Sequence, residues 1–378
     1  MFKYLRFFTI TKLILFFLCC SSNDIKNLNK KSTTYDIIKD LFTIKDSCDL
    51  KYPSEAFPKY IQDVSITGDY IYVISNTKKY PLVKFYKNGN FAKLVSRIGL
   101  GPGEIKGWNH KIDIEDSLLV IFDGEYNRLL FYKNDQYYFE KSYTDDAFER
   151  LDVIINDIKL LNNDYLLVSC CYNANYNLLL MKINNKDLKI VQRLYKLPLS
   201  SDLPRILGSA THHGLVKCGN IYLSHFSYPP HIIESTFIED SLKIIKVMKN
   251  INFHDFQRVD SSLSLKTLKV NSLDDYTSIY YSISKLRWVV KMRNYYVGLY
   301  TYYPSNFKEV KGFKLKDAKY KLFILHNNKI IHERKLSRRS CFIPYNGEII
   351  YYFFPYKDKE IVRLYFLTIN EKNPIFSG

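Results

Sequence analysis

Short apolar segments separated by two-residue polar turns recur along the chain. The first unit reads DVSIT-GD-YIYVIS and turns at Gly68 and Asp69. Five further units of the same kind turn at residues 115–116, 162–163, 219–220, 293–294 and 346–347. Asn, Gly and Asp tolerate the positive φ angles that tight hairpin turns require. The pattern therefore predicts six β-hairpins.

The spacing of these hairpins indicates a repeat. Successive turns lie 47, 47, 57, 74 and 53 residues apart, and most units are followed by a second apolar hairpin. The motif FYKN occurs in the second hairpin of the first two units, at residues 85–88 and 131–134. Four strands in a period of about 45–50 residues are typical of a propeller blade. We therefore predict an all-β fold, a six-bladed β-propeller with four-stranded blades.

The two ends of the chain each leave one strand-like segment to be explained. After EIVRLYFLTIN, residues 360–370, the chain is nearly finished, so the sixth unit lacks a fourth strand. The segment TYDIIKDLFTI, residues 34–44, belongs to no complete unit. We predict that it closes the last blade and removes an exposed sheet edge. The propeller would then span residues 34–374, with an insertion around 251–280 where the spacing is longest.

Composition supports a packed β-protein and bears on its partners. Of 378 residues, 47% are hydrophobic and 16% aromatic, which suits a β-structure with a sizeable core. The net charge is +17, and residues 284–340 carry fifteen Lys or Arg against three acids. These cations alternate with apolar residues, as on solvated strands, and no nucleic-acid-binding motif accompanies them. We therefore do not expect a nucleic-acid partner.

The N-terminus has the pattern of an export signal. Three basic residues lie within the first twelve positions, and the apolar run 13–18 ends at Cys19 and Cys20. A charged region followed by a short apolar region is typical of an export signal. The apolar region is too short to span a bilayer as a helix, which needs about 20 apolar residues. We predict a lipoprotein signal over residues 1–20, lipid attachment at Cys20 and a polar tether over 21–33. Lipidation of Cys19 and an ordinary secretory signal are the alternatives.

A glycine-rich stretch, GLGPGEIKGW, occupies residues 99–108. A phosphate-binding loop reads GxxxxGK[ST] between a strand and a helix, but no Lys-Ser/Thr pair follows Gly103 and no helical pattern comes after it. The stretch lies between the fourth strand of one unit and the first strand of the next. We therefore interpret it as a crossover between blades, with Gly101 and Gly103 at positive φ.

Several of these motifs together resemble a known family. The segment RIGLGPGEI at residues 97–105, the lipoprotein-like signal, the FYKNGNF hairpin and the closing RLYFLTIN resemble the six-bladed β-propeller lipoproteins of Bacteroides-type Gram-negative bacteria. Those proteins are in turn similar to NHL-repeat propellers. The resemblance covers essentially the whole mature chain, strongly in the first two units and weakly over residues 251–300. It implies a fold and a location in the cell envelope, anchored in the outer membrane on its periplasmic or outer side, but no reaction.

Propellers bind ligands where crossovers and the loops between second and third strands converge, and this face supplies the candidate site. Its polar and aromatic candidates are Arg97, Glu104, Trp108, His110, Arg205 and His212. Glu104 has a second interpretation, in which it bonds backbone amides of its own turn. We predict a monomeric module that binds a small molecule, a glycan or a protein. The alternative is a hydrolase or lyase that acts on a sugar or peptide in the same funnel, with catalytic residues that the sequence does not identify.

Metal and cofactor chemistry is not indicated by the sequence. Consecutive histidines on a strand, such as His212 and His213, point to opposite faces. The five cysteines beyond the signal lack any CxxC spacing, which excludes a zinc site or disulfide framework of the usual kind. We therefore expect no bound metal and no cofactor.

Overall fold

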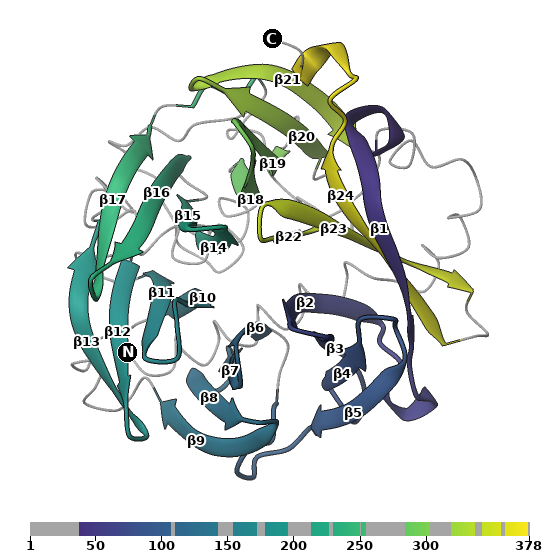
Figure 1. Ribbon diagram of the computed structural model, residues 1–378, viewed down its shortest axis with the longest axis vertical. Coiled ribbons are helices and arrows are strands. Elements are labelled where there is room, and N and C mark those ends of the chain that lie inside the picture. The colour runs from purple at the N-terminus through teal and green to yellow at the C-terminus, as the bar shows by residue number, and fades with distance from the viewer. Residues whose placement is uncertain are drawn as a thin grey trace, which may run out of the picture.

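The computed structural model describes residues 38–106, 110–142, 154–171, 178–195, 213–226, 230–249, 251–254, 284–302, 319–336, 342–356 and 360–376. Within these residues, strands β1–β24 form six separate four-stranded antiparallel sheets, arranged as blades around a central axis (Figure 1). The predicted six-bladed β-propeller with four-stranded blades is confirmed. The expected insertion falls almost wholly on residues 255–283, which lie outside the described part of the chain.

Each blade is built from strands consecutive in the chain, except the sixth. Blade 1 contains β2 (Tyr60–Thr67), β3 (Tyr70–Asn76), β4 (Leu82–Tyr86) and β5 (Phe91–Ser96); blade 2 contains β6 (His110–Glu115), β7 (Leu118–Asp123), β8 (Arg128–Lys133) and β9 (Gln136–Ser142). Blade 3 contains β10 (Ile154–Leu160), β11 (Tyr165–Cys171), β12 (Leu178–Asn184) and β13 (Asp187–Leu194); blade 4 contains β14 (His213–Cys218), β15 (Ile221–Phe226), β16 (His231–Ile238) and β17 (Ser241–Met248). Blade 5 contains β18 (Lys285–Met292), β19 (Tyr295–Tyr302), β20 (Lys319–His326) and β21 (Lys329–Leu336); blade 6 contains β22 (Phe342–Tyr345), β23 (Glu348–Tyr356), β24 (Ile361–Ile369) and β1 (Phe42–Lys51). The described residues also contain two short 3-10 helices, Ser54–Ala56 and Pro374–Phe376.

The hairpin turns follow the chemistry that the sequence indicated. Gly68, Asp116, Gly219, Arg293 and Gly347, each in the turn between the first and second strand of a blade, all have positive φ. The turn between β10 and β11 differs from the prediction because it spans four residues, 161–164, rather than two. There the side chain of Asn162 accepts a hydrogen bond from the Asp164 amide at 2.9 Å, so a side chain stabilises this turn.

An N-terminal strand closes the ring, as predicted, but it begins later than expected. Strand β1 pairs antiparallel with β24 along its whole length, and the two run side by side in Figure 1. Residues 38–41, which the sequence analysis assigned to this strand, form a helical turn instead. Ile38 and Leu41 are both buried, and their three-residue spacing is that of one face of a helix.

A bidentate ion pair fastens the closing strand. Asp49 on β1 accepts hydrogen bonds from Arg363 Nε at 2.5 Å and Nη2 at 2.6 Å. The hydrogen bond from Arg363 is the largest influence on the pKa of Asp49 and holds it below the usual value. Both side chains are 35% exposed, so solvent screens the pair.

We expect Arg363→Met to lower the melting temperature at pH 7, because it removes both hydrogen bonds to Asp49. A carboxyl group whose pKa is lowered on folding stabilises the fold above its unfolded pKa of about 3.9. That contribution disappears as the pH falls through the lower folded pKa. Thermal melts of both proteins from pH 7 to pH 2.5 test this. A difference that does not shrink in acid would contradict an electrostatic role for the pair.

The core lies between neighbouring blades. Val120 and Phe131 of blade 2, for example, pack with Ile158 and Val168 of blade 3, and all four are fully buried. This face-to-face packing sets the innermost strands β2, β6, β10, β14, β18 and β22 around the axis.

Aspartates on the innermost strands join three pairs of blades. Carboxylates on β2, β6 and β10 each accept a hydrogen bond from a backbone amide of the next blade's innermost strand. The pairs are Asp63 with Ile112 at 3.2 Å, Asp113 with Leu160 at 2.7 Å, and Asp157 with Leu215 at 2.9 Å. These bonds hold charged side chains beside the axis.

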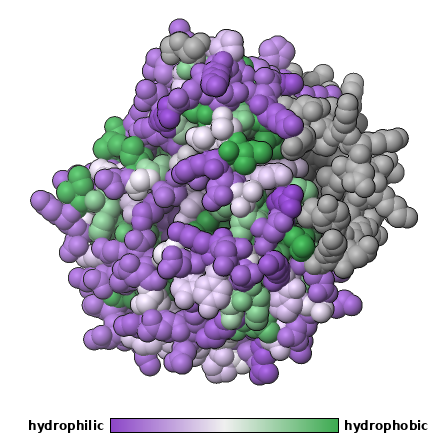
Figure 2. Space-filling model, turned by 45° about the vertical axis from the view of Figure 1, so that its right-hand side comes forward, coloured by the Kyte–Doolittle hydropathy of each residue, from purple (hydrophilic) through white to green (hydrophobic). Residues whose placement is uncertain are grey.

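The face of the molecule that Figure 2 shows is mainly polar where it is coloured. Figure 2 shows hydrophilic residues over most of the visible face, with hydrophobic ones in separate patches. Lysines such as Lys329 and Lys335 in the basic segment are exposed, as expected for solvated strands, whereas Lys285 is fully buried. No helix within the described residues is long and apolar enough to cross a membrane.

Candidate functional site

The glycine-rich crossover between blades 1 and 2 is stabilised by its own side chains. The Glu104 carboxylate accepts a hydrogen bond from the Gly101 amide at 2.7 Å and pairs with Arg97 Nε at 2.5 Å. The Gly101 amide and then the Arg97 side chain hold the pKa of Glu104 below its usual range. A Cβ atom on Gly99 would lie 1.8 Å from a Glu104 oxygen. Both candidates, Arg97 and Glu104, are thus brought together, and Glu104 bonds its own turn.

Gly103 fixes the other side of this crossover. Its carbonyl accepts hydrogen bonds from Ser96 Oγ at 2.7 Å and from the Tyr132 hydroxyl. Its φ of +71° confirms the predicted left-handed conformation, whereas the same prediction for Gly101 is wrong, because its φ is not positive. The stretch therefore serves as a crossover, as the sequence indicated.

His110, another predicted site residue, lies in a buried charged cluster beside the crossover. His110 Nδ1 is 3.8 Å from an oxygen of Asp123, and neither side chain is more than 1% exposed. Arg128 pairs with Asp123 at 3.2 Å and with Glu140 at 3.1 Å. Burial raises the pKa of Asp123, and the Lys106 amide and Arg128 oppose this rise. The cluster joins the crossover to blade 2 through Arg128, which also donates to the Glu104 carbonyl. Its His110 and Asp123 are closed to solvent, whereas Glu140 is 37% exposed.

The remaining predicted residues are not placed. Trp108, Arg205, His212 and the lipidation candidate Cys20 lie outside the described residues. Among the residues that are described, no three His, Cys, Asp or Glu side chains are grouped so that they would hold a metal ion.

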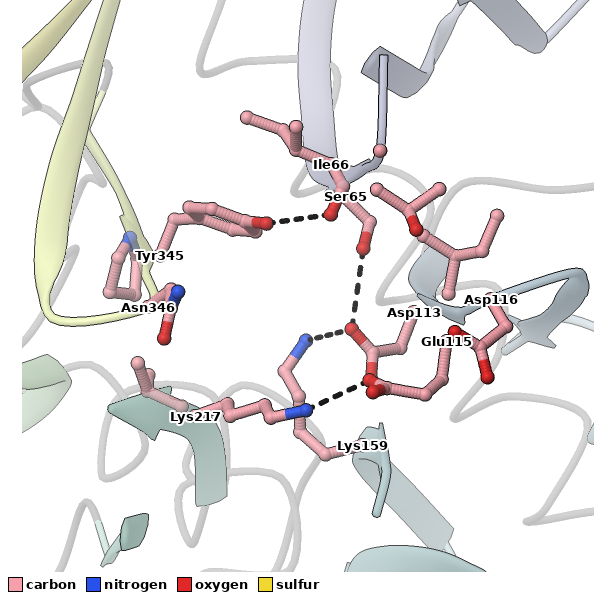
Figure 3. A pocket seen from close by; sticks show the side chains of 14 residues that line it. Ser65, Ile66, Asp113, Glu115, Asp116, Lys159, Lys217, Tyr345 and Asn346 are labelled. Carbon is pink, nitrogen blue, oxygen red and sulfur yellow. Dashed lines mark hydrogen bonds and ion pairs between the residues drawn. The ribbon is translucent and has the colours of Figure 1, made fainter. Parts of the chain in front are cut away.

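A cavity opens at the opposite end of the axis, where the hairpin turns between first and second strands meet (Figure 3). Its volume is about 260 Å³. Blades 1, 2, 3, 4 and 6 supply its lining: Ser65, Ile66, Thr67, Gly68, Asp113, Ile114, Glu115, Asp116, Lys159, Val216, Lys217, Pro344, Tyr345 and Asn346. We call it the axial cavity.

One ion pair in the wall of the axial cavity is buried and held firmly. Asp113 on β6 bonds Lys159 Nζ at 3.2 Å, Ser65 Oγ at 3.3 Å and the Leu160 amide at 2.7 Å. Burial raises the pKa of the Asp113 carboxyl, and Lys159 opposes that rise. Burial acts to lower the pKa of Lys159, but the surrounding carboxylates outweigh it and raise that pKa overall.

Lys111 lies beside this pair. Its ammonium nitrogen is 3.9 Å from a carboxylate oxygen of Asp63 and 3.9 Å from one of Asp157. Burial opposes the charged form of Lys111, yet the two carboxylates raise its pKa overall. The innermost strands of blades 1 to 3 thus place carboxylate and ammonium groups close to one another around the axis.

A second ion pair crosses the mouth of the axial cavity. Lys217 on β14 reaches Glu115 on β6 at 2.8 Å, and both side chains are 32% exposed. Figure 3 shows both side chains extending into the opening from opposite walls. On another side, the Tyr345 hydroxyl donates to the Ile66 carbonyl at 2.7 Å. Side chains from blades 2, 4 and 6 and a backbone carbonyl from blade 1 therefore define this mouth.

Blade 5 takes no part in the described lining. The turn of blade 4 meets that of blade 6 directly, because the Gly219 amide donates to the Asn346 side chain at 3.1 Å. The mouth is thus displaced from blade 5 toward blades 1, 2 and 3.

Sequence reasoning missed the axial cavity. The available signal was the set of charged residues within otherwise apolar first strands of the repeats. These charged residues occur in the first-strand segments IQDVSIT, HKIDIED, NDIKLL and GLVKCGN. Aligned by their turns, these segments place Asp113, Glu115, Lys159 and Lys217 near one end of the innermost strands, whereas Asp63 lies nearer the middle of its strand.

The fold and this arrangement define a six-bladed β-propeller with a charged axial cavity. The sequence matches the 6-bladed beta-propeller family DUF5128 over residues 21–267, and the chain belongs to that family. Among curated proteins, none matches this sequence significantly.

Two solved structures from Bacteroides species have a similar fold. One is a Bacteroides fragilis protein whose name suggests that it is exported; it is 12% identical, with a TM-score of 0.57, over 88% of this chain and 96% of that one. The other is a Bacteroides vulgatus member of the DUF4221 family, 9% identical, with a TM-score of 0.52, over 87% and 98%. At these identities the likeness concerns the fold alone.

Proposed function

We propose that this protein is a ligand-binding module of the cell envelope, held to the outer membrane by a lipid on Cys20, and that the axial cavity is its binding site. The observation that carries the binding role is the cavity itself, a concave site on a rigid ring with polar groups converging from five blades. The name of the Bacteroides fragilis relative supports export.

The cavity supports binding better than the crossover face does. On that face, Glu104 is bonded to the Gly101 amide of its own turn as well as to Arg97, and His110 is buried against Asp123. The mouth of the axial cavity, in contrast, carries the partly exposed charged groups of Lys217 and Glu115. A ligand reaches those groups without opening the packed core.

The binding site is tested by filling it. Thr67→Trp places a large side chain in the lining of the axial cavity, whereas Thr43→Trp makes the same change at an exposed position on β1. We expect at least one compound in a panel of saccharides, amino acids and organic acids to raise the melting temperature of the wild type and of Thr43→Trp, but not of Thr67→Trp. Equal responses from all three proteins would contradict a site in this cavity.

Anchoring is tested separately at the N-terminus. Cys20→Ser is expected to abolish incorporation of labelled fatty acid and to leave an unprocessed or soluble protein, because the acylated thiol is lost. Wild type and Cys19→Ser should both be labelled and partition into detergent. Labelling that persists in Cys20→Ser but not in Cys19→Ser would assign the lipid to Cys19. Absence of label from the wild type would refute the anchor.

A further inference from the structure

We infer that the ligand of the axial cavity is a small zwitterion, with an ammonium and a carboxylate group on one short frame, as in an amino acid. The inference rests on the proposed binding function of this cavity and adds the chemistry of its ligand. Three observations carry it: the size of the cavity, the signs of its charges and the different burial of its two ion pairs.

The size of the axial cavity limits the ligand. A volume of about 260 Å³ is below the roughly 300–1,000 Å³ of sites that hold drug-sized compounds. A metabolite with few atoms fits, whereas an oligosaccharide or a folded partner would contact only the rim.

The wall presents charges of both signs at close range. Asp113, Glu115 and Asp116 contribute carboxylates, and Lys159 and Lys217 contribute ammonium groups. A ligand with a single charge would face like charges as well as opposite ones. A ligand with both charges finds a partner for each.

The two ion pairs differ in how readily they open. Lys159 and Asp113 are 14% and 11% exposed, and Asp113 has two further hydrogen bonds. Breaking this pair would separate the mostly buried Lys159 ammonium group from the carboxylate to which it is hydrogen-bonded. Lys217 and Glu115 are each 32% exposed, and ion pairs open to water contribute little to stability. The Lys217–Glu115 pair at the mouth is therefore the one that a ligand separates.

Separating the Lys217–Glu115 pair selects for a zwitterion. A cation placed on Glu115 would leave Lys217 without its partner, and an anion placed on Lys217 would do the same to Glu115. A ligand carboxylate on Lys217 together with a ligand ammonium on Glu115 replaces one ion pair by two. Asp116, next to Glu115 in the lining, adds a further acceptor for the ammonium group.

Calorimetric titration of the mature protein tests this with matched probes. L-alanine and larger L-amino acids supply both charges; propylamine, propionate and glycerol supply a cation, an anion and a neutral polyol of similar size. We expect one or more amino acids to bind at least tenfold more tightly than any of the three analogues. Lys217→Met and Glu115→Gln should each weaken that binding at least tenfold.

Lys141→Met is the matched control, because Lys141 pairs with Asp187 at the same 2.8 Å but on outer strands. It should leave amino-acid binding unchanged. The double variant E115K/K217E restores opposite charges and should recover part of the binding that E115K alone removes. Thermal melts establish that each variant is folded.

The outcomes separate this inference from the proposed function. Suppose that glycerol or a saccharide binds, that Thr67→Trp blocks this binding, and that no amino acid binds. The proposed binding function then stands, and the inference of a zwitterionic ligand is refuted. Propylamine or propionate binding as tightly as the amino acids also refutes it. The inference of a zwitterionic ligand is also refuted if Lys217→Met and Glu115→Gln leave the affinity for amino acids unchanged. If no probe binds in a manner sensitive to Thr67→Trp, both proposals fail.

Discussion

A chain that begins at Tyr52, and so lacks β1 and the preceding helical turn, is expected to aggregate or to unfold well below the melting temperature of the parent. Ile38, Leu41, Phe42 and Leu50 are at most 3% exposed. Burial of each such side chain contributes about 1.5–3 kcal/mol. Their combined contribution is therefore comparable with the roughly 5–15 kcal/mol that stabilises a typical protein.

The truncation also exposes the edge of β24, which pairs with β1 from Ile361 to Ile369, and unpaired edges promote association. A chain beginning at Thr34 is the control, because it keeps every described residue. Thermal melts and size-exclusion chromatography compare the two. Equal stability of both chains would mean that β1 is dispensable for ring closure.

Gly103→Val is expected to lower the melting temperature by several degrees. The residue has a φ of +71°, and a Cβ there would lie 2.8 Å from the Cβ of Tyr137. Left-handed backbone costs a residue with a side chain about 1–2 kcal/mol, and the overlap adds about 1–3 kcal/mol. Gly219→Val is the matched control: its φ is +61°, but nothing lies within 4 Å of its added Cβ, so only the backbone cost applies.

Adding ATP should not change the effect of Gly103→Val, because the crossover binds no phosphate in this interpretation. Glu104→Gln should also lower the melting temperature, since it weakens the bonds to Gly101 and Arg97. Unchanged stability of Gly103→Val, combined with loss of ATP binding, would instead identify a phosphate loop.

The sequence predicts the blades well because each is made from neighbouring segments with local turn chemistry. It places the closing strand less well. In TYDIIKDLFTI the apolar residues fit a helical turn as well as a strand, and Ile38 and Leu41 bury on one side of such a turn. The true strand, FTIKDSCDLK, has an exposed stretch in its middle, so its apolar signal is weak.

The axial cavity was beyond local pattern reading because its groups come from distant parts of the chain. Glu115 and Lys217 are separated by 102 residues, and Tyr345 bonds a carbonyl 279 residues away. Whether these residues lie together depends on the number of blades and on the position of the cavity mouth, which blade 5 does not line. The crossover candidates Arg97 and Glu104, only seven residues apart, were within the reach of sequence reasoning.

The pairing of the first strand with the last has a consequence for the order of folding. Asp49 and Arg363, which join β1 to β24, are 314 residues apart. During synthesis the N-terminal strand therefore has no partner until nearly the whole chain has emerged, and contacts of such high sequence separation form slowly. Ring closure is thus a late event in the folding of this chain, because it waits for residues 361–369 of β24.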